Sequence, residues 1–198
     1  MNILTIFLCA RSTENGAKAK QNLVLEYPMA ESIIEVVQLD INDAGSRSAL
    51  IQKFKNEGTK LDVLVNNAGV FYRCKATYGI IDQTLNTNFW NTLAFTEDIL
   101  TADLLSEDGK VIMISSKLGS LSILEKRNPQ VKSELSNYKN NLSISRLIDI
   151  ATACHSDLKS VQNCKLWADS VYSLSKLYLS IWVIFTNFYH LLTNLDLS

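Results

Sequence analysis

The stretch Leu61-Asp-Val-Leu-Val-Asn-Asn-Ala-Gly69 is the most informative about the fold. Its first five residues form an almost continuous apolar run, which is typical of a parallel strand buried on both faces. Polar Asn66 and Asn67 follow at once, and Gly69 closes the segment as a turn residue does. We therefore predict a buried β-strand at 61–65 with polar groups at its carboxyl end.

Strands and helices are predicted to alternate on both sides of this stretch. The predicted strands are residues 3–9, 33–39, 61–65 and 110–114, and the predicted helices are residues 12–25, 44–56 and 83–105. In the helix at 44–56, Leu50, Ile51 and Phe54 share one face. Such alternation predicts an α/β fold with a doubly wound parallel sheet. We see no repeat or linker, so residues 1–198 are expected to form a single domain.

Polar residues follow each predicted strand. Ligands of open α/β sheets bind at the carboxyl ends of the strands. The residues at these ends are Arg11, Asp40, Asn66-Asn67-Ala68-Gly69 and Ser115-Ser116. Any one of them could be an ordinary turn residue, but four such groups at one edge predict a binding site.

Tyr172-Ser-Leu-Ser-Lys176 carries the clearest chemistry. Residues four apart on a helix lie on the same face, so Tyr172 and Lys176 would be neighbours. An adjacent ammonium favours the phenolate form of a tyrosine, which suits proton transfer to or from a carbonyl or alcohol oxygen. The spacing alone is common by chance, and it gains weight from the three groups that precede it.

Composition excludes several classes of protein. The chain has 198 residues, 47% of them hydrophobic, which favours a globular protein over a disordered one. A net charge of −1 argues against a nucleic-acid binder. The four cysteines have neither zinc-ligand nor redox spacing, so we expect no metal site, and reduced thiols in the cytoplasm.

The two ends are apolar. Residues 1–10 lack the basic start of a secretory signal and are better interpreted as a buried strand. Residues 177–195 are uncharged and could just span a bilayer. Polar residues dilute that segment, so a buried helix is favoured over a membrane span, and we expect no membrane partner.

Together these segments resemble the short-chain dehydrogenases/reductases, and among them the carbonyl reductases that use NADPH. The resemblance spans roughly residues 5 to 180. Its motifs are Cys9-Ala-Arg11, Gln38-Leu-Asp-Ile41, Leu61–Gly69, Asn86-Thr-Asn-Phe-Trp90, Gly109-Lys-Val-Ile-Met-Ile-Ser-Ser116 and Tyr172–Lys176.

The resemblance implies four catalytic residues. Ser116 would polarise the substrate carbonyl, and Tyr172 would give the proton to its oxygen. Lys176 would favour ionisation of Tyr172 and hold the ribose of the nicotinamide, while Asn88 would anchor a water that relays protons. Without the family, the serine could simply close a strand, Asn88 could be an ordinary helix residue, and Tyr172 could pack in a core.

The resemblance also implies a cofactor, NADP(H). An arginine near the adenosine ribose accommodates the 2′-phosphate of NADP, and Arg11 is suitably placed after a strand. Asp40 and Ile41 would lie against the adenine. Asn67 and Gly69 would line the adenosine and ribose side, and Tyr172 and Lys176 the nicotinamide ribose.

One spacing points to the carbonyl-reductase branch. Tyr172 follows Ser116 by 56 positions, which indicates an insertion at about 118–168. The body of the insertion includes residues 131–138 and 143–153, where Leu147, Ile148 and Ile150 suggest an amphipathic helix. In that branch the insertion covers the surface used elsewhere for oligomers, so we expect a monomer. The alternative is a variable loop without this effect.

The chain also departs from the family. It has no Thr-Gly-x-x-x-Gly-x-Gly turn to hold the pyrophosphate. It begins at what resembles the family's second strand, and no Pro-Gly turn follows Lys176; Asn91 stands where the branch usually has glycine. We therefore expect a Rossmann-like domain lacking the first strand and glycine-rich turn, shortened at both ends, with unpaired edges on the neighbouring strands.

The predicted function is NADPH-dependent reduction of carbonyl compounds (aldehydes, ketones or quinones) to alcohols. The substrate would be a small molecule. The alternative is a catalytically inactive member of the family with a regulatory or membrane-associated role.

Overall fold

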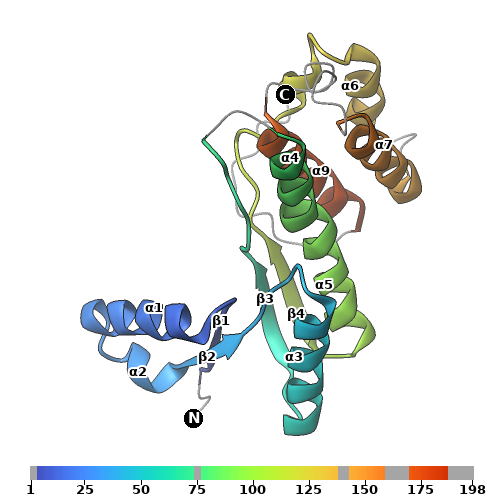
Figure 1. Ribbon diagram of the computed structural model, residues 1–198. Coiled ribbons are helices and arrows are strands. Elements are labelled where there is room, and N and C mark those ends of the chain that lie inside the picture. The colour runs from blue at the N-terminus through green and yellow to red at the C-terminus, as the bar shows by residue number, and fades with distance from the viewer. Residues whose placement is uncertain (1–3, 74–76, 138–142, 159–169, 187–198) are drawn as a thin grey trace. The chain divides into compact units, whose positions relative to one another are not determined.

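The computed structural model describes residues 4–73, 77–137, 143–158 and 170–186 (Figure 1). The chain divides into two compact units, residues 1–60 and residues 61–198. Each unit contains a parallel two-stranded sheet together with helices. The prediction of an α/β fold with parallel strands is therefore confirmed.

In the first unit, strands β1 (Ile6–Ala10) and β2 (Ile34–Gln38) pair in parallel. Ala10 lies opposite Gln38, so the segments that follow the two strands leave the sheet at the same edge. The helices of this unit are α1 (Thr13–Glu26), α2 (Ala30–Ile33) and α3 (Ala44–Glu57).

Helix α3 supplies much of the apolar core of this unit. Leu50, Ile51 and Phe54 are buried on one face of it, as their spacing predicts. The ring of Phe54 packs against that of Phe7 on β1, with 4.8 Å between the ring centroids. Asp43 begins the helix, and its carboxylate accepts a hydrogen bond from the backbone N–H of Gly45 at 2.8 Å.

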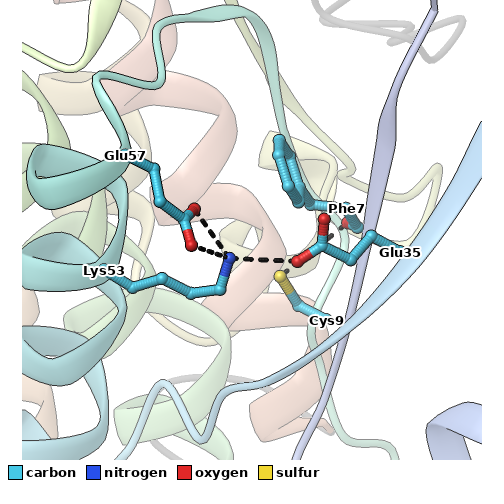
Figure 2. A network of polar contacts seen from close by, with 5 residues as sticks. All are labelled: Phe7, Cys9, Glu35, Lys53 and Glu57. Carbon is cyan, nitrogen blue, oxygen red and sulfur yellow. Dashed lines mark hydrogen bonds and ion pairs between the residues drawn. The ribbon is translucent and has the colours of Figure 1, made fainter.

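A surface ion-pair network joins α3 to β2 (Figure 2). Lys53 Nζ donates to Glu57 at 2.7 Å and to Glu35 at 3.0 Å. Hydrogen bonds to Glu57, and then to Glu35, raise the pKa of Lys53 above its ordinary value. Since the two carboxylates are exposed and Lys53 is partly exposed, solvent screens the network and it stabilises the unit little.

In the second unit, strands β3 (Leu61–Asn66) and β4 (Leu105–Met113) pair in parallel. A long helical rod connects them, and it consists of α4 (Tyr78–Leu85), the π-helical segment η1 (Asn86–Trp90) and α5 (Asn91–Thr101). The prediction of one helix over 83–105 is wrong in its bounds, because Thr77 caps the start and Asp103, with φ of 54°, turns the chain into β4.

Two strands are less buried than predicted. Val63 and Val65 on β3 are 47% and 52% exposed, whereas Leu64 and Asn66 between them are buried. Ile6 on β1 is also exposed. The prediction of burial on both faces is wrong, because the described residues cover only one face of β3. Within the described ranges, β1 pairs only with β2 and β3 only with β4, so one edge of each is open.

The segment between Ser116 and Tyr172 contains η2 (Leu121–Leu124), α6 (Pro129–Ser136) and α7 (Ile144–Asp157). The predicted amphipathic helix is present as α7, while Tyr138 and residues 159–169 lie outside the described residues. The amphipathic character of α7 is confirmed, since Leu147 and Ile150 are buried while the opposite face is exposed.

A chain of side-chain hydrogen bonds fastens α7 to the helical rod. Trp90 Nε1 donates to His155 Nδ1 at 3.1 Å, and His155 Nε2 lies 3.0 Å from Asp82 Oδ1. Because the indole N–H can only donate, Nδ1 must accept, so the proton of a neutral His155 sits on Nε2 and points at Asp82. Asn86 donates to the other oxygen of Asp82 at 2.9 Å. These residues line an open pocket of about 410 Å³.

Helix α9 (Val171–Thr186) lies beside α4 and packs against η1, α7 and β4 (Figure 1). Its residues from Ser173 to Val183 are buried, so the predicted buried helix is confirmed as far as Val183. Residues 187–195 of the predicted tail lie outside the described residues. Among the helices that the structure describes, none has the length and apolarity needed to cross a bilayer.

We predict that His155→Ala destabilises the second unit by about 1–2 kcal/mol, because it removes two hydrogen bonds that hold α7 on the rod. The free energy of unfolding in urea measures this change. Ser156→Ala, which changes a neighbour lining the same pocket, should have an effect below about 0.5 kcal/mol. Equal effects of the two substitutions would contradict the role assigned to His155.

Candidate functional site

The loops after β3 and β4 begin side by side. The backbone N–H of Ile114 donates to the carbonyl of Asn66 at 3.0 Å, which continues the sheet by one residue. Asn66 itself is buried, and its amide donates to Thr96 on α5 at 2.9 Å. Asn67 is exposed at the strand end. The first asparagine is therefore structural, and the second is free to meet a ligand.

Asn88 joins three segments of the site. Its Oδ1 accepts from the backbone N–H of Val70 at 2.7 Å, and its Nδ2 donates to the carbonyl of Val70 at 3.0 Å. The same Nδ2 donates to Ser175 Oγ on α9 at 3.1 Å. Asn88 is 1% exposed. It thus holds the loop after β3 against both η1 and α9.

The π-helical segment η1 surrounds Asn88. One π turn inside an α-helix shifts the side chains that follow it around the axis, and such turns are frequent at functional sites. Thr87, Asn88 and Phe89 are all buried, so this segment turns both polar and apolar side chains inward.

The first serine of the pair is a buried structural group. Ser115 Oγ donates to the carbonyl of Lys176 at 3.0 Å and lies 2.6 Å from Ser180 Oγ. Ser180 is fully buried and donates to the same carbonyl at 2.7 Å. These contacts fasten the end of β4 to α9 at the position of Lys176.

The second serine lies at the surface of the site. Ser116 is half-buried, and its Oγ accepts from the backbone N–H of Leu118 at 3.2 Å. Gly119 allows this loop to touch α9, because a Cβ there would lie 2.7 Å from the backbone carbon of Lys176. Ser116 therefore presents a hydroxyl from a loop held close to α9.

Lys176 is a buried cation. Its Nζ donates to the carbonyl of Ile114 at 2.6 Å and lies 5.9 Å from the centroid of the Tyr172 ring. Burial lowers the pKa of Lys176 below its ordinary value, because desolvation disfavours the ammonium. An ammonium has three N–H donors, and among the described residues only Ile114 receives one of them. The other two are available to a ligand.

Tyr172 is half-buried on the face of α9 that carries Lys176. The ring of Phe71, from the loop after β3, packs on that of Tyr172 edge to face, with centroids 4.8 Å apart. The carbonyl of Tyr172 accepts from Ser175 Oγ at 2.7 Å, which links it to Asn88.

The remaining predicted cofactor residues lie in the first unit. Arg11 follows β1 and is exposed, and its carbonyl accepts from Gln38 at 3.3 Å. Asp40 follows β2, and its carboxylate accepts from the backbone N–H of Asn42 at 2.9 Å. Ile41 is buried. All three predicted residues thus occupy the carboxyl edge of the β1–β2 sheet.

The structure therefore groups the predicted residues in two places. Asn67, Gly69, Asn88, Ser116, Tyr172 and Lys176 belong to the second unit, and Arg11, Asp40 and Ile41 to the first. Sequence reasoning missed Phe71, Ser175 and Ser180. The spacing of Ser180 from Lys176 was the available signal for Ser180, since positions 176 and 180 share one face of α9.

Comparison with known proteins shows the family to which this chain belongs. The family model described as short chain dehydrogenase matches residues 2–126. The chain belongs to this family. It is 29% identical to carbonyl reductase (NADPH) 1 of Bos taurus and 32% identical to carbonyl reductase (NADPH) 3 of Mus musculus, each over 87% of this chain. It spans 60% of the length of these two relatives.

A solved structure supports the fold. Menthone neomenthol reductase from Mentha piperita matches 93% of this chain and 77% of its own, with a TM-score of 0.78 and 22% identity. A structural match at this sequence identity supports the fold only. The predicted Rossmann-like class is therefore confirmed.

Two groups of the described residues suit parts of a nicotinamide cofactor. In the second unit, the two spare N–H groups of Lys176 suit ribose hydroxyls, and in the first unit the exposed guanidinium of Arg11 suits a phosphate. A pyrophosphate is usually held where a glycine-rich turn opens a helix. The sequence contains no such turn, and in the described part of the chain α1 and α3 open at Ser12 and Asp43 instead. The described residues of each unit thus offer a group that suits one part of the cofactor.

Substitution of Ser115 and of Ser116 should have different effects on stability. We predict that Ser115→Ala lowers the free energy of unfolding by about 1–2 kcal/mol, because it breaks the buried contacts with Lys176 and Ser180. Ser116→Ala should change stability by less than about 0.5 kcal/mol. Chemical denaturation of both variants measures the difference. Similar losses from both would contradict the structural role of Ser115.

The buried ammonium of Lys176 predicts a pH dependence. Because its folded pKa lies below its unfolded pKa, the unfolded state binds more protons between the two values, and stability rises with pH through that window. The free energy of unfolding of wild type minus that of Lys176→Met should therefore increase towards the ordinary lysine pKa of about 10.4. If this difference in the free energy of unfolding stays constant or falls over the alkaline range, burial does not lower the pKa of Lys176.

Proposed function

We propose that this chain is an NADPH-dependent reductase that converts aldehydes, ketones or quinones to alcohols. The observation that carries the proposal is the placement of Tyr172 and Lys176 on one face of α9, next to the loop of Ser116 at the carboxyl end of β4. Membership of the short-chain dehydrogenase family supports it.

Each side chain has a step to perform. The hydroxyl of Ser116 donates a hydrogen bond to the substrate carbonyl and polarises it. Tyr172 gives its proton to the carbonyl oxygen, and the nearby ammonium of Lys176 stabilises the phenolate that remains. Bound NADPH supplies the hydride that reaches the carbonyl carbon, so the product is an alcohol.

Asn88 acts in this scheme as a positioning residue. Its bonds to Val70 and Ser175 hold the loop after β3 and the start of α9 in place. The proton relay through a water at Asn88 stays a prediction, as does the catalytic role of Ser116.

Arg11 supports the choice of NADP(H) over NAD(H). An exposed guanidinium at the carboxyl end of β1 offers a planar, charged fork to a 2′-phosphate. The names of two relatives include NADPH, which agrees with this choice. Asp40, Ile41, Asn67 and Gly69 complete the proposed binding residues.

A second candidate is a family member without catalytic activity. Such a protein would keep the Tyr172–Lys176 arrangement without turning over substrate.

We further propose a cytoplasmic monomer. Helix α7 packs against α9 and is bonded to the rod, so it occupies surface that could otherwise meet another chain. Among the described residues, the exposed Cys9 is a free thiol, which suits a reducing compartment. Cys74 and Cys164 lie outside the described residues.

The proposal is tested by cofactor binding and turnover of the 198-residue chain. NADPH at about 100 times its dissociation constant should add roughly 2.7 kcal/mol, or about 5–10 °C of thermal stability, while NADH at the same concentration should add much less. Arg11→Gln should weaken NADPH binding by about tenfold and leave NADH binding unchanged. Tyr172→Phe should lower kcat/KM by at least about 100-fold.

A second tyrosine of α9 supplies the control. Tyr178 is fully buried and takes part in none of the proposed steps, so Tyr178→Phe should keep both binding and turnover. NADPH binding without turnover would favour the inactive alternative. No binding of either nucleotide would contradict the proposed cofactor.

A further inference from the structure

An exposed aromatic side chain of the loop after β3 lies next to Tyr172. Phe71 is 52% exposed, although its ring packs on the Tyr172 ring with centroids 4.8 Å apart and an interplanar angle of 60°. A large apolar side chain that is half open to solvent is ordinary when it stands alone. Here it lies in contact with the proposed proton donor.

A second apolar side chain is exposed beside the other proposed catalytic hydroxyl. Leu118 is 55% exposed, and its backbone N–H donates to Ser116 Oγ at 3.2 Å. The two hydroxyls proposed to meet the substrate oxygen are thus each next to an exposed apolar group. A substrate bound there would extend over apolar surface.

A cation lies over the Phe71 ring. The guanidinium carbon of Arg73 lies 6.0 Å from the centroid of the Phe71 ring, and Arg73 is exposed. Guanidinium groups stack on aromatic rings and bind carboxylates through two parallel hydrogen bonds. An aromatic ring that packs on Phe71 would therefore bring a substituent within reach of Arg73.

From this arrangement we infer that Phe71 and Arg73 determine substrate specificity, and that the preferred substrates are aryl ketones or aldehydes that carry a carboxylate. The carbonyl end reaches Tyr172 and Ser116, the ring packs on Phe71, and the carboxylate pairs with Arg73. The inference rests on the proposed function, because it takes Tyr172 as the group that meets the carbonyl.

The test compares three ligands of similar size on the purified 198-residue chain. 4-Acetylbenzoate has the ring and the charge, methyl 4-acetylbenzoate has only the ring, and 4-acetylcyclohexanecarboxylate has only the charge. Ligand-observed NMR gives the dissociation constants with and without NADPH. We expect 4-acetylbenzoate to bind about 2- to 10-fold more tightly than each analogue. This is the contribution expected of one aromatic pair or one exposed ion pair, and each analogue lacks one of the two.

Two variants separate the contributions of Phe71 and Arg73 to ligand binding. Phe71→Leu keeps an apolar side chain and removes the ring, so it should weaken both aromatic ligands by about 3- to 10-fold and spare the cyclohexane analogue. Arg73→Gln should weaken only the two carboxylates, by about 2- to 5-fold, with a smaller effect at high salt. Lys117→Gln removes another exposed cation next to Ser116 and should change none of these ratios.

The outcomes separate the inference from the proposed function. Selective binding that both variants weaken, without turnover, would support the inference and contradict the reductase proposal. Turnover that Tyr172→Phe abolishes, with equal affinity for the three ligands, would overturn the inference alone. Absence of 4-acetylbenzoate binding, or a Phe71→Leu variant with wild-type ratios, would also overturn it.

Discussion

The side-chain amide of Asn88 is the interaction on which the site depends. Only an amide offers an acceptor for the N–H of Val70 together with donors for its carbonyl and for Ser175. A carboxylate would keep the acceptor and lose the donors, and an apolar side chain would leave both backbone groups of Val70 unpaired. Each buried polar group without a partner costs about 1–3 kcal/mol. The loop that carries Gly69 and Phe71 therefore keeps its place only while this amide does.

A buried polar layer around Lys176 depends on small side chains. Ser115 and Ser180 both reach the carbonyl of Lys176, and Gly119 lets the loop after β4 touch the same backbone. Larger side chains at these positions would separate α9 from β4. The ammonium of Lys176 would then lose its bond to Ile114, although burial makes that bond necessary. Close backbone approach is thus the condition for placing a charged donor beside Tyr172.

Local patterns in the sequence predict some features of this molecule well and others badly. The alternation of apolar runs and capped helices predicts the strands, α3 and α7, because each depends on residues close in the chain. The motif from Tyr172 to Lys176 predicts a shared helix face for the same reason. The π-helical turn at Asn88 was missed, because one additional residue in a turn leaves the apolar pattern almost unchanged. The exposure of Val63 and Val65 was also missed, since an apolar strand has the same sequence whether one face or two are covered.

The two serines show most clearly why the role of some residues can be assigned only from the three-dimensional structure. The sequence alone does not distinguish Ser115 from Ser116. Because adjacent residues at a strand end point in different directions, Ser115 is buried against α9 while Ser116 faces the loop surface. Everything proposed for proton transfer, from Ser116 to Tyr172 and Lys176, lies in the second unit and is held by bonds within it. Arg11, proposed to bear on the choice of cofactor, lies in the first. The contacts that hold Ser116, Tyr172 and Lys176 in place therefore do not involve Arg11.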